Sequence, residues 1–186
     1  MNALPDFSGP SDTVARALIG VTLLVGGVGG RIVETEAYDQ LDAASHTFGG
    51  PTPRNAAMFG PSGCAYVYRS YGIHWCLNIV CRASGHGAGV LIRALEPTHG
   101  LAQMQARRGM LNAQLLCAGP GRVGQALGID ASFNHLPLDR APFELIANVG
   151  SESVQVLAGP RIGISKAMDK PWRFGEAGSR FLSRRF

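Results

Sequence analysis

The chain has 186 residues, which suits one domain, and 46% of them are hydrophobic, enough to build a core and to exclude a disordered protein. Only 16% are charged, so a charged group inside an apolar segment needs a specific explanation. The net charge of +4 comes almost wholly from arginine, whose planar guanidinium suits phosphate oxygens, and this balance is compatible with a nucleic-acid partner.

The first ten residues are expected to form a flexible N-terminus, and residues 11–186 a single domain. Residues 1–10 have neither the basic nor the apolar region of a signal peptide. No later apolar run is long enough to cross a bilayer. These features predict an intracellular protein that does not associate with membranes.

The N-terminal part of the domain is predicted to be a helix followed by a hairpin. Ser11 and Asp12 are candidates to cap a short helix with one apolar face. That face would present Val14, Ala17 and Leu18. Residues 21–25 are a strand candidate, and the glycine-rich turn 26–30 leads into a second strand over 31–38.

Two carboxylates interrupt the apolar pattern of the second strand. Since side chains alternate along a strand, one face should carry the two acids and an aromatic ring, and the other should be apolar. The first face would contain Ile32, Glu34, Glu36 and Tyr38, and the second Val33, Thr35 and Ala37. The clustering of acids and an aromatic ring on one surface indicates a site.

Residues 39–63 are rich in Gly, Pro, Asn and Thr and show no periodicity, so this long loop is expected to be a functional surface. His46 lies in it, close in sequence to Tyr38. A surface or structural histidine is the alternative interpretation. Three strand candidates follow, at 64–70, 74–82 and 87–96, with a turn at Tyr71-Gly72 and with Pro97 ending the third.

The second half of the chain is predicted to contain short helices at 99–108, at 112–117 and from the Gly119-Pro120-Gly121 segment to Leu127. A strand pair is plausible near 143–147 and 153–157. The fold class is therefore α+β, a single compact domain with a curved, mostly antiparallel β-sheet flanked by short helices.

Arg93 lies inside an apolar strand, where a guanidinium is costly to bury unless a carboxylate meets it. Glu34 and Glu36 are the obvious partners. A carboxylate kept ionised beside an arginine can hold and activate water. A structural ion pair that ties two strands together is the competing interpretation.

All four tyrosines lie between positions 38 and 71. Tyr66 and Tyr68 share a strand face and could be either packing residues or the walls of a pocket for a flat substrate. Tyr71, beside a glycine in a turn, should be exposed and could enter a base stack, or could simply face solvent. Asn78, an amide within an apolar strand, either bonds to backbone or contacts a ligand edge.

A metal centre is not expected. The best local cluster has a spacing that matches none of the common zinc patterns, and alternation places His74 and Cys81 on opposite faces. That cluster contains His74, Cys76, Cys81 and His86. The segment Gly119-Pro120-Gly121 lacks the Gly-Lys-Ser/Thr ending of a nucleotide-binding loop, so helix capping is its expected role.

An ordered series of motifs resembles the alkyladenine (3-methyladenine) DNA glycosylase family over nearly the whole chain. The motifs are RIVETEAY at 31–38, ASH at 44–46, TPRN at 52–55, MFGP at 58–61, YVY at 66–68, YG at 71–72, VLIRALEP at 90–97, CAGP at 117–120, QALG at 125–128, PRIGI at 160–164 and PWRF at 171–174. No single motif is decisive, but their order is. Lys166 stands where the pattern has an aromatic residue, and the basic N-terminal extension of longer members is missing.

This resemblance implies a monofunctional base-excision enzyme with no cofactor and no metal. It assigns Glu36 as the general base that positions water and Arg93 as its partner at that water. Tyr38, His46 and Tyr68 would form the walls around an extruded base. At matching positions, Tyr71 would be the DNA wedge, and Asn78 would disfavour a purine 2-amino group.

The sequence thus predicts a hydrolase of the N-glycosidic bond of alkylated or deaminated purines in double-stranded DNA. The expected substrates are 3-methyladenine, 7-methylguanine, hypoxanthine and ethenoadenine. The protein is expected to be a cytoplasmic monomer, nucleoid-associated if bacterial. One alternative is a lesion-binding protein that flips bases without cleavage, and another is a metal-dependent nucleic-acid hydrolase.

Overall fold

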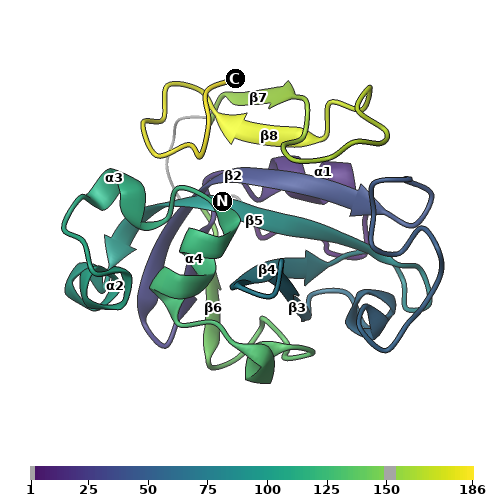
Figure 1. Cartoon of the computed structure of the whole chain (residues 1–186), viewed down its shortest axis with the longest axis horizontal. Helices are drawn as coiled ribbons and strands as arrows, with labels where there is room; N and C mark the ends of the chain where they lie inside the picture. The colour runs from purple at the N-terminus through teal and green to yellow at the C-terminus, as the bar shows by residue number, and fades with distance from the viewer. Residues whose placement is uncertain (1–2, 149–153) are drawn as a thin grey trace.

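Two long antiparallel strands, β2 (Val28–Asp39) and β5 (Ala88–His99), form the centre of the molecule in the computed structural model, which describes residues 3–148 and 154–186 (Figure 1). Within these residues eight strands make one sheet, with the order β3-β4-β5-β2-β1-β6 and with β8 pairing both β2 and β7. Every strand pair is antiparallel. The other strands are β1 (Thr22–Val25), β3 (Ala65–Ser70), β4 (His74–Val80), β6 (Phe143–Ile146), β7 (Val156–Gly159) and β8 (Arg173–Glu176).

The sheet divides along β2. The first part of β2 pairs with β1, whereas Glu34, Thr35 and Glu36 pair with β8 on one side and with β5 on the other. The segment that carries the two acids is therefore enclosed by strands on both edges. This explains why both glutamates are fully buried.

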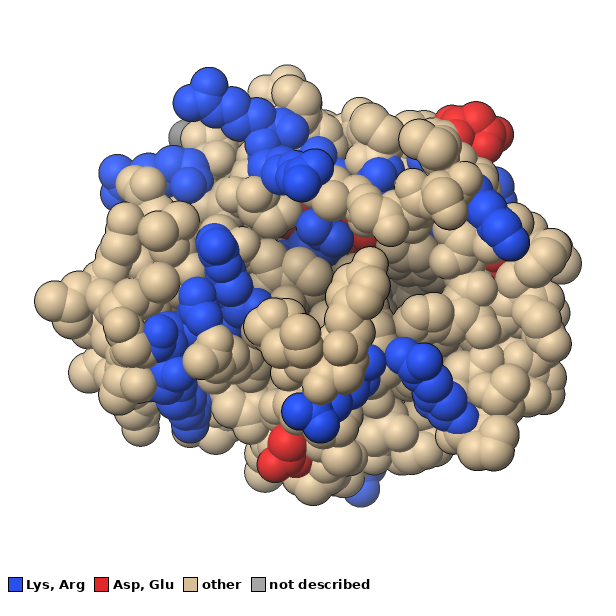
Figure 2. Space-filling view, viewed as in Figure 1, with Lys and Arg blue, Asp and Glu red and all other residues tan. Residues whose placement is uncertain are grey.

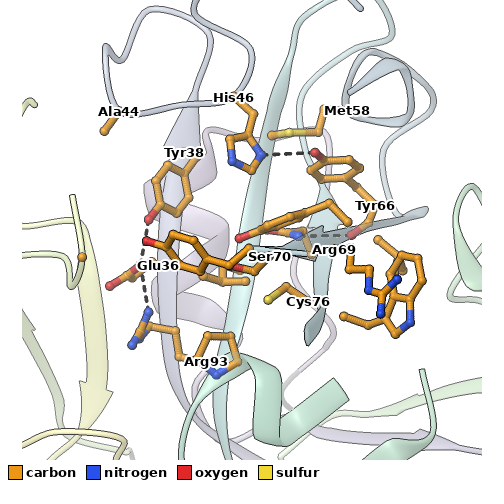
Figure 3. Close-up of a pocket in the computed structure, with 18 of the residues that line it drawn as sticks. Glu36, Tyr38, Ala44, His46, Met58, Tyr66, Arg69, Ser70, Cys76 and Arg93 are labelled. Carbon is orange, nitrogen blue, oxygen red and sulfur yellow. Dashed lines mark hydrogen bonds and ion pairs between the residues drawn. The ribbon is translucent and has the colours of Figure 1, made fainter. Parts of the chain in front are cut away.

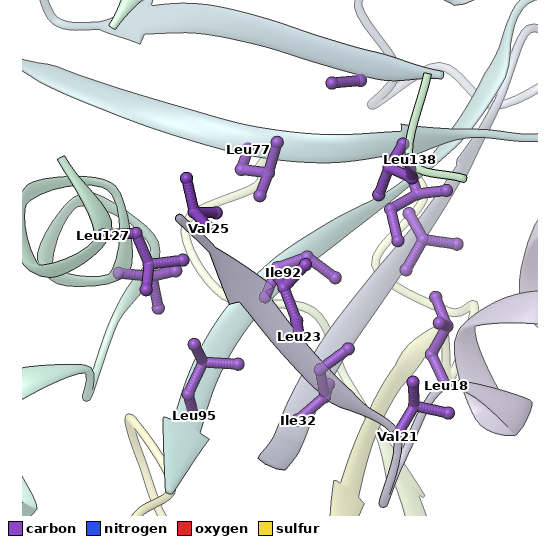
Figure 4. Packing of buried hydrophobic residues seen from close by; sticks show 14 of the residues in the cluster. Leu18, Val21, Leu23, Val25, Ile32, Leu77, Ile92, Leu95, Leu127 and Leu138 are labelled. Carbon is purple, nitrogen blue, oxygen red and sulfur yellow. The ribbon is translucent and has the colours of Figure 1, made fainter. Parts of the chain in front are cut away.

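Short helices complete the core. Val14 and Leu18 of the α1 region, Val123 and Leu127 of α4, and many inward residues of the sheet belong to one buried cluster (Figure 4). The helices are α1 (Ser11–Ala17), α2 (Leu101–Arg108), α3 (Ala113–Leu116) and α4 (Pro120–Leu127), with 3₁₀ turns at Ala56–Phe59 and Ala131–Phe133. This curved antiparallel sheet with few short helices confirms the predicted α+β class. Within the described ranges, no helix is long and apolar enough to span a bilayer.

One face assignment was wrong. Ile32 belongs to the hydrophobic core rather than to the face that carries Glu34 and Glu36. The reason is a shift in register: Ile32 pairs with Leu95 and Glu34 with Ala94, so the residue between Ile32 and Glu34 is an extra one on β2. A β-bulge of this kind reverses the alternation of side chains.

Several other boundaries also differ from prediction. Pro97 does not end β5, which continues to His99, because a proline is tolerated where a register shift interrupts the ladder. The predicted strands near 143–147 and 153–157 exist in part but do not pair with each other: β6 pairs with β1 and β7 with β8. Residue 153 lies outside the described residues. In α1, Ala15 is buried and Ala17 is exposed.

Candidate active site

Glu36 is held by three different groups on β2, β5 and the segment that follows β7. Its Oε2 accepts a hydrogen bond of 2.8 Å from the Tyr38 hydroxyl, and its Oε1 accepts one of 2.7 Å from the backbone amide of Ile162. The Arg93 Nη1 lies 3.3 Å from Oε2 (Figure 3). These contacts fix the carboxylate in one orientation at the end of a cavity.

Arg93 reaches the acids because of a second register shift. Ala94 pairs with Glu34 and Ile92 with Thr35, which leaves Arg93 as the extra residue on β5. Bulges commonly re-aim a side chain next to an active site. Arg93 is 7% exposed, and its Nε lies 3.2 Å from Glu34 Oε1. It therefore bridges the two acids, as the sequence predicted.

The environment of Glu36 makes its carboxylate a stronger base than an exposed one. Burial raises the pKa of Glu36 above its ordinary value, and the charge of Arg93, the Ile162 amide and the Tyr38 hydroxyl oppose that shift. A carboxylate with a raised pKa accepts a proton more readily, which suits a general base operating near neutral pH.

Aromatic rings line the wall of the same cavity. Tyr68 stacks on Tyr66 with centroids 5.5 Å apart and planes at 24°, and His46 meets Tyr68 edge-on at 4.6 Å. The His46 Nδ1 lies 3.2 Å from the Tyr66 hydroxyl. Burial, with a smaller contribution from the charge of Arg54, lowers the pKa of His46, which favours the neutral imidazole. Tyr66, which the strand pattern predicts to be either a packing residue or a pocket wall, is buried and supports Tyr68 from behind, and it also lines the cavity.

The floor of the cavity contains Asn78, which is 4% exposed. Its Nδ2 donates a hydrogen bond of 3.1 Å to the backbone carbonyl of Tyr66. The amide therefore bonds to backbone, which is one of the two roles predicted for it. Because Asn78 also lines the cavity, its contact with a ligand stays a prediction. Cys76 and Leu91 line the cavity beside it.

Tyr71 protrudes at the rim of the cavity, in the turn between β3 and β4. Its side chain is 92% exposed and its backbone has φ +48°, an uncommon conformation for a residue other than glycine. Strain of this kind persists where the surrounding structure enforces it, and it often marks functional segments. An exposed ring on a constrained turn is suited to insertion into another molecule.

All seven predicted site residues line one cavity of about 920 Å³. They are Glu36, Tyr38, His46, Tyr68, Tyr71, Asn78 and Arg93. Sequence reasoning missed the Ile162 amide, because a backbone group leaves no residue signature. It also missed the buried ion pair between Arg161 and Asp42, in which Arg161 lies 4.8 Å from the Tyr38 ring. The PRIGI motif at 160–164 was the one available signal for this region.

No cluster of three or more His, Cys, Asp or Glu side chains in residues 3–148 and 154–186 is arranged to hold a metal ion. In the cluster considered from sequence, His86 contacts Asp39 at 3.0 Å.

A cavity lined by aromatic rings, with a buried carboxylate of raised pKa in its wall, indicates an enzyme of the class that binds a flat ring. Comparison with known proteins narrows this class. Residues 5–180 match the model of the family described as methylpurine-DNA glycosylase, so the chain belongs to that family. It is accordingly a DNA glycosylase, a hydrolase of N-glycosyl bonds that acts in DNA repair.

Similar proteins cover nearly the whole chain. A protein of Nitrosospira multiformis is 64% identical over 97% of this chain and 93% of its own length. A protein of Rhodopseudomonas palustris strain CGA009 is 61% identical over 93% of this chain and 83% of its own length. One from Rhizobium meliloti is 57% identical over 93% of this chain and 91% of its own length. Each is named "Putative 3-methyladenine DNA glycosylase".

Proposed function

We propose that the protein excises alkylated or deaminated purines from double-stranded DNA, with Glu36 as the base that activates water. The observation that carries this proposal is the buried Glu36–Arg93 pair at the end of an aromatic cavity. The candidate substrates are 3-methyladenine, 7-methylguanine, hypoxanthine and ethenoadenine. The names of the relatives support the first of these.

The chemistry required fits the geometry of the pair. When the N-glycosidic bond breaks, positive charge develops on the sugar C1′, and an anion at the end of the cavity stabilises that charge. Water then forms a bond to C1′ and gives its proton to the Glu36 carboxylate, while the bonding electrons leave with the base. Arg93, 3.3 Å from Glu36, helps to orient both the carboxylate and the water.

A base inside a duplex is out of reach, so the target must leave the helix, and a damaged pair opens at lower cost. Tyr38, His46 and Tyr68 would enclose the extruded ring. An alkylated base that carries positive charge is attracted to such rings through cation–π interactions and is also a better leaving group. Asn78 would disfavour a purine with a 2-amino group.

Tyr71 would fill the space that the extruded base leaves. Removing its ring should weaken binding to a damaged duplex by about 1–3 kcal/mol, the typical value of one base–aromatic stack. Tyr71→Ala and Tyr71→Phe can be compared by fluorescence anisotropy on an ethenoadenine duplex. Because the phenylalanine variant keeps the ring, it should bind like the wild type. A Tyr71→Ala variant with normal affinity and normal excision would contradict the wedge role.

The decisive experiment measures base release. Purified protein is incubated with duplexes that contain each of the four bases, and free base and abasic sites are quantified. Glu36→Gln should lower the single-turnover rate by roughly 100-fold or more, the usual contribution of a general base. Glu144→Gln, at an exposed glutamate of β6, is the matched control and should keep full activity. Full activity in Glu36→Gln would contradict the proposed mechanism.

A non-catalytic lesion-binding protein was the alternative considered from the sequence, and membership of a glycosylase family speaks against it. It would bind the same duplexes but release no base, and it would have no need for a buried, activated carboxylate at the end of the cavity. Glu36 favours the enzyme over the binder for this reason. We also propose that the protein acts on DNA as a monomer, which sedimentation of the protein–duplex complex would test.

A further inference from the structure

The C-terminal segment, residues 181–186, reaches the buried acids from outside the central sheet. Glu34 accepts two hydrogen bonds from Ser183: one of 2.8 Å from its Oγ to Oε1, and one of 2.5 Å from its backbone amide to Oε2. Arg173 on β8 donates a further bond of 2.7 Å from its Nε to Oε1. A residue 149 positions away in sequence therefore supplies two of the donors to Glu34.

The C-terminal segment packs at a defined position against β7 and β8. The Phe186 ring lies 4.0 Å from the guanidinium of Arg173, whose Nη2 donates to the carbonyl of Arg184. A Cβ added to Gly175 would meet the Phe186 ring at 2.3 Å, and one added to Gly159 would meet it at 3.1 Å. The absence of side chains on β7 and β8 at these positions makes room for the ring. The placement of Ser183 is thus fixed by the residues that follow it.

The Ser183 hydroxyl also contacts Arg93. It accepts a bond of 3.4 Å from the Arg93 Nη2 while donating to Glu34, and the Arg93 Nε donates to the same Glu34 oxygen at 3.2 Å. These contacts hold two nitrogens of the guanidinium. The third, Nη1, is directed to Glu36 at 3.3 Å.

We propose that Ser183 is a positioning residue of the active site, whose hydroxyl fixes Glu34 and Arg93 together so that Arg93 is aimed at Glu36. The inference rests on the proposed function, in which Glu36 is the base. Neither Ser183 nor Glu34 touches the reacting atoms. Their effect reaches the reaction through Arg93.

The pH dependence of excision tests whether Ser183 acts on Glu36 through Arg93. The groups that face Glu36 are Arg93 on β5, Glu34, Tyr38 and the more distant Tyr68, and among them the positive charge of Arg93 does most to lower the pKa of Glu36. If Arg93 is no longer aimed at Glu36, that pKa rises further. The base is then protonated up to a higher pH, so the ascending limb of the rate profile should move to higher pH.

The test compares Ser183→Ala, Ser183→Thr and the full-length wild type on a hypoxanthine duplex. Ser84→Ala is the matched control, since Ser84 is an exposed serine in the turn between β4 and β5 and does not line the cavity. Single-turnover rates are measured across a pH series, duplex affinity by anisotropy and folding by thermal melting. Because a hydrogen bond to a charged group is lost, Ser183→Ala should be roughly tenfold slower at neutral pH.

The expected result is a slower Ser183→Ala whose rate profile is shifted to higher pH and whose duplex affinity is unchanged. Ser183→Thr should recover the rate, and Ser84→Ala should behave like the wild type. A Ser183→Ala profile that superimposes on that of an active wild type overturns the positioning role alone. So does a rate loss without a pH shift that Ser183→Thr fails to restore. A wild type that releases no base overturns the proposed function as well.

Discussion

At the scale of single residues, Glu36 is an ionisable group in an environment that disfavours its charge. Burial raises its pKa, so the folded protein binds this proton more tightly than the unfolded chain does. Ionisation of Glu36 therefore lowers the stability of the fold as the pH rises through the folded-state pKa. The proposed mechanism requires the ionised form, so under that mechanism activity and stability make opposite demands on Glu36.

Glu36→Gln should for this reason be more stable than the wild type in mildly alkaline solution. The glutamine cannot ionise, and the difference in melting temperature between the two proteins should shrink as the solution is acidified. Differential scanning calorimetry measures this difference in melting temperature. Roughly pH 5 to 8 is the suitable range, because folded proteins are usually most stable there. A loss of stability in the variant that is equal at every pH would contradict the expectation.

The ion pair between Arg161 and Asp42 leads to a second prediction. Both side chains are fully buried, and Arg161 also donates a bond of 2.9 Å to the carbonyl of Ala37 and lies beneath the Tyr38 ring. Asp42→Ala leaves a buried charge without its partner, which should cost about 3–5 kcal/mol in free energy of unfolding. Urea denaturation measures the change.

The matched control is Asp139→Ala, which breaks the exposed pair between Asp139 and Arg140. Solvent screens such pairs, so its denaturation midpoint should stay near that of the wild type. Equal effects of the two substitutions would show that burial is not what gives the Arg161–Asp42 pair its strength.

At the scale of secondary-structure elements, α4 lies unusually close to β4. Gly124 is the point of contact, and a Cβ built there would be 2.0 Å from the backbone carbonyl oxygen of Trp75. Trp75 and Pro120, at the start of α4, both line the cavity. The spacing between helix and strand therefore helps to shape the cavity wall.

Gly124→Ala should force α4 away from β4 and destabilise the protein by about 1–3 kcal/mol, the usual penalty for overpacking. The direction of the stability change is informative. Alanine has a higher intrinsic helix propensity than glycine, so the same substitution would stabilise an uncrowded helix. Gly49→Ala, where a Cβ meets no atom within 4 Å, should leave the denaturation midpoint nearly unchanged. A Gly124→Ala protein as stable as the wild type would mean that α4 can shift without loss.

Prediction from sequence succeeded at this scale where local pattern decides the structure. Alternation placed Glu36 and Tyr38 on one face, and their hydroxyl–carboxylate contact of 2.8 Å agrees with this. It failed for Ile32, because a β-bulge depends on the partner strand and leaves no mark in the strand's own sequence. β8 was missed for a related reason: Arg173–Glu176 is short, and its pairing with β2 comes from tertiary contact.

At the scale of the whole molecule, the fold gathers residues from positions 36 to 164 around one cavity and leaves basic side chains around its opening. Figure 2 shows lysine and arginine side chains on several sides of a hollow, with few acidic groups on the same face. Arg54 and Arg69 belong to the cavity rim and are exposed. Positive charge arranged in this way is expected to attract the DNA backbone toward the cavity.

Position, rather than total charge, should govern DNA affinity. Arg69→Gln at the rim and Arg140→Gln in the exposed pair with Asp139 each lower the net charge by one. If Arg69 contacts a phosphate, its loss should reduce the slope of log affinity against log salt concentration by about one. Arg140→Gln should leave that slope unchanged. Anisotropy titrations of an undamaged duplex at several salt concentrations measure both slopes, and equal slopes in the two variants would mean that this rim does not bind the backbone.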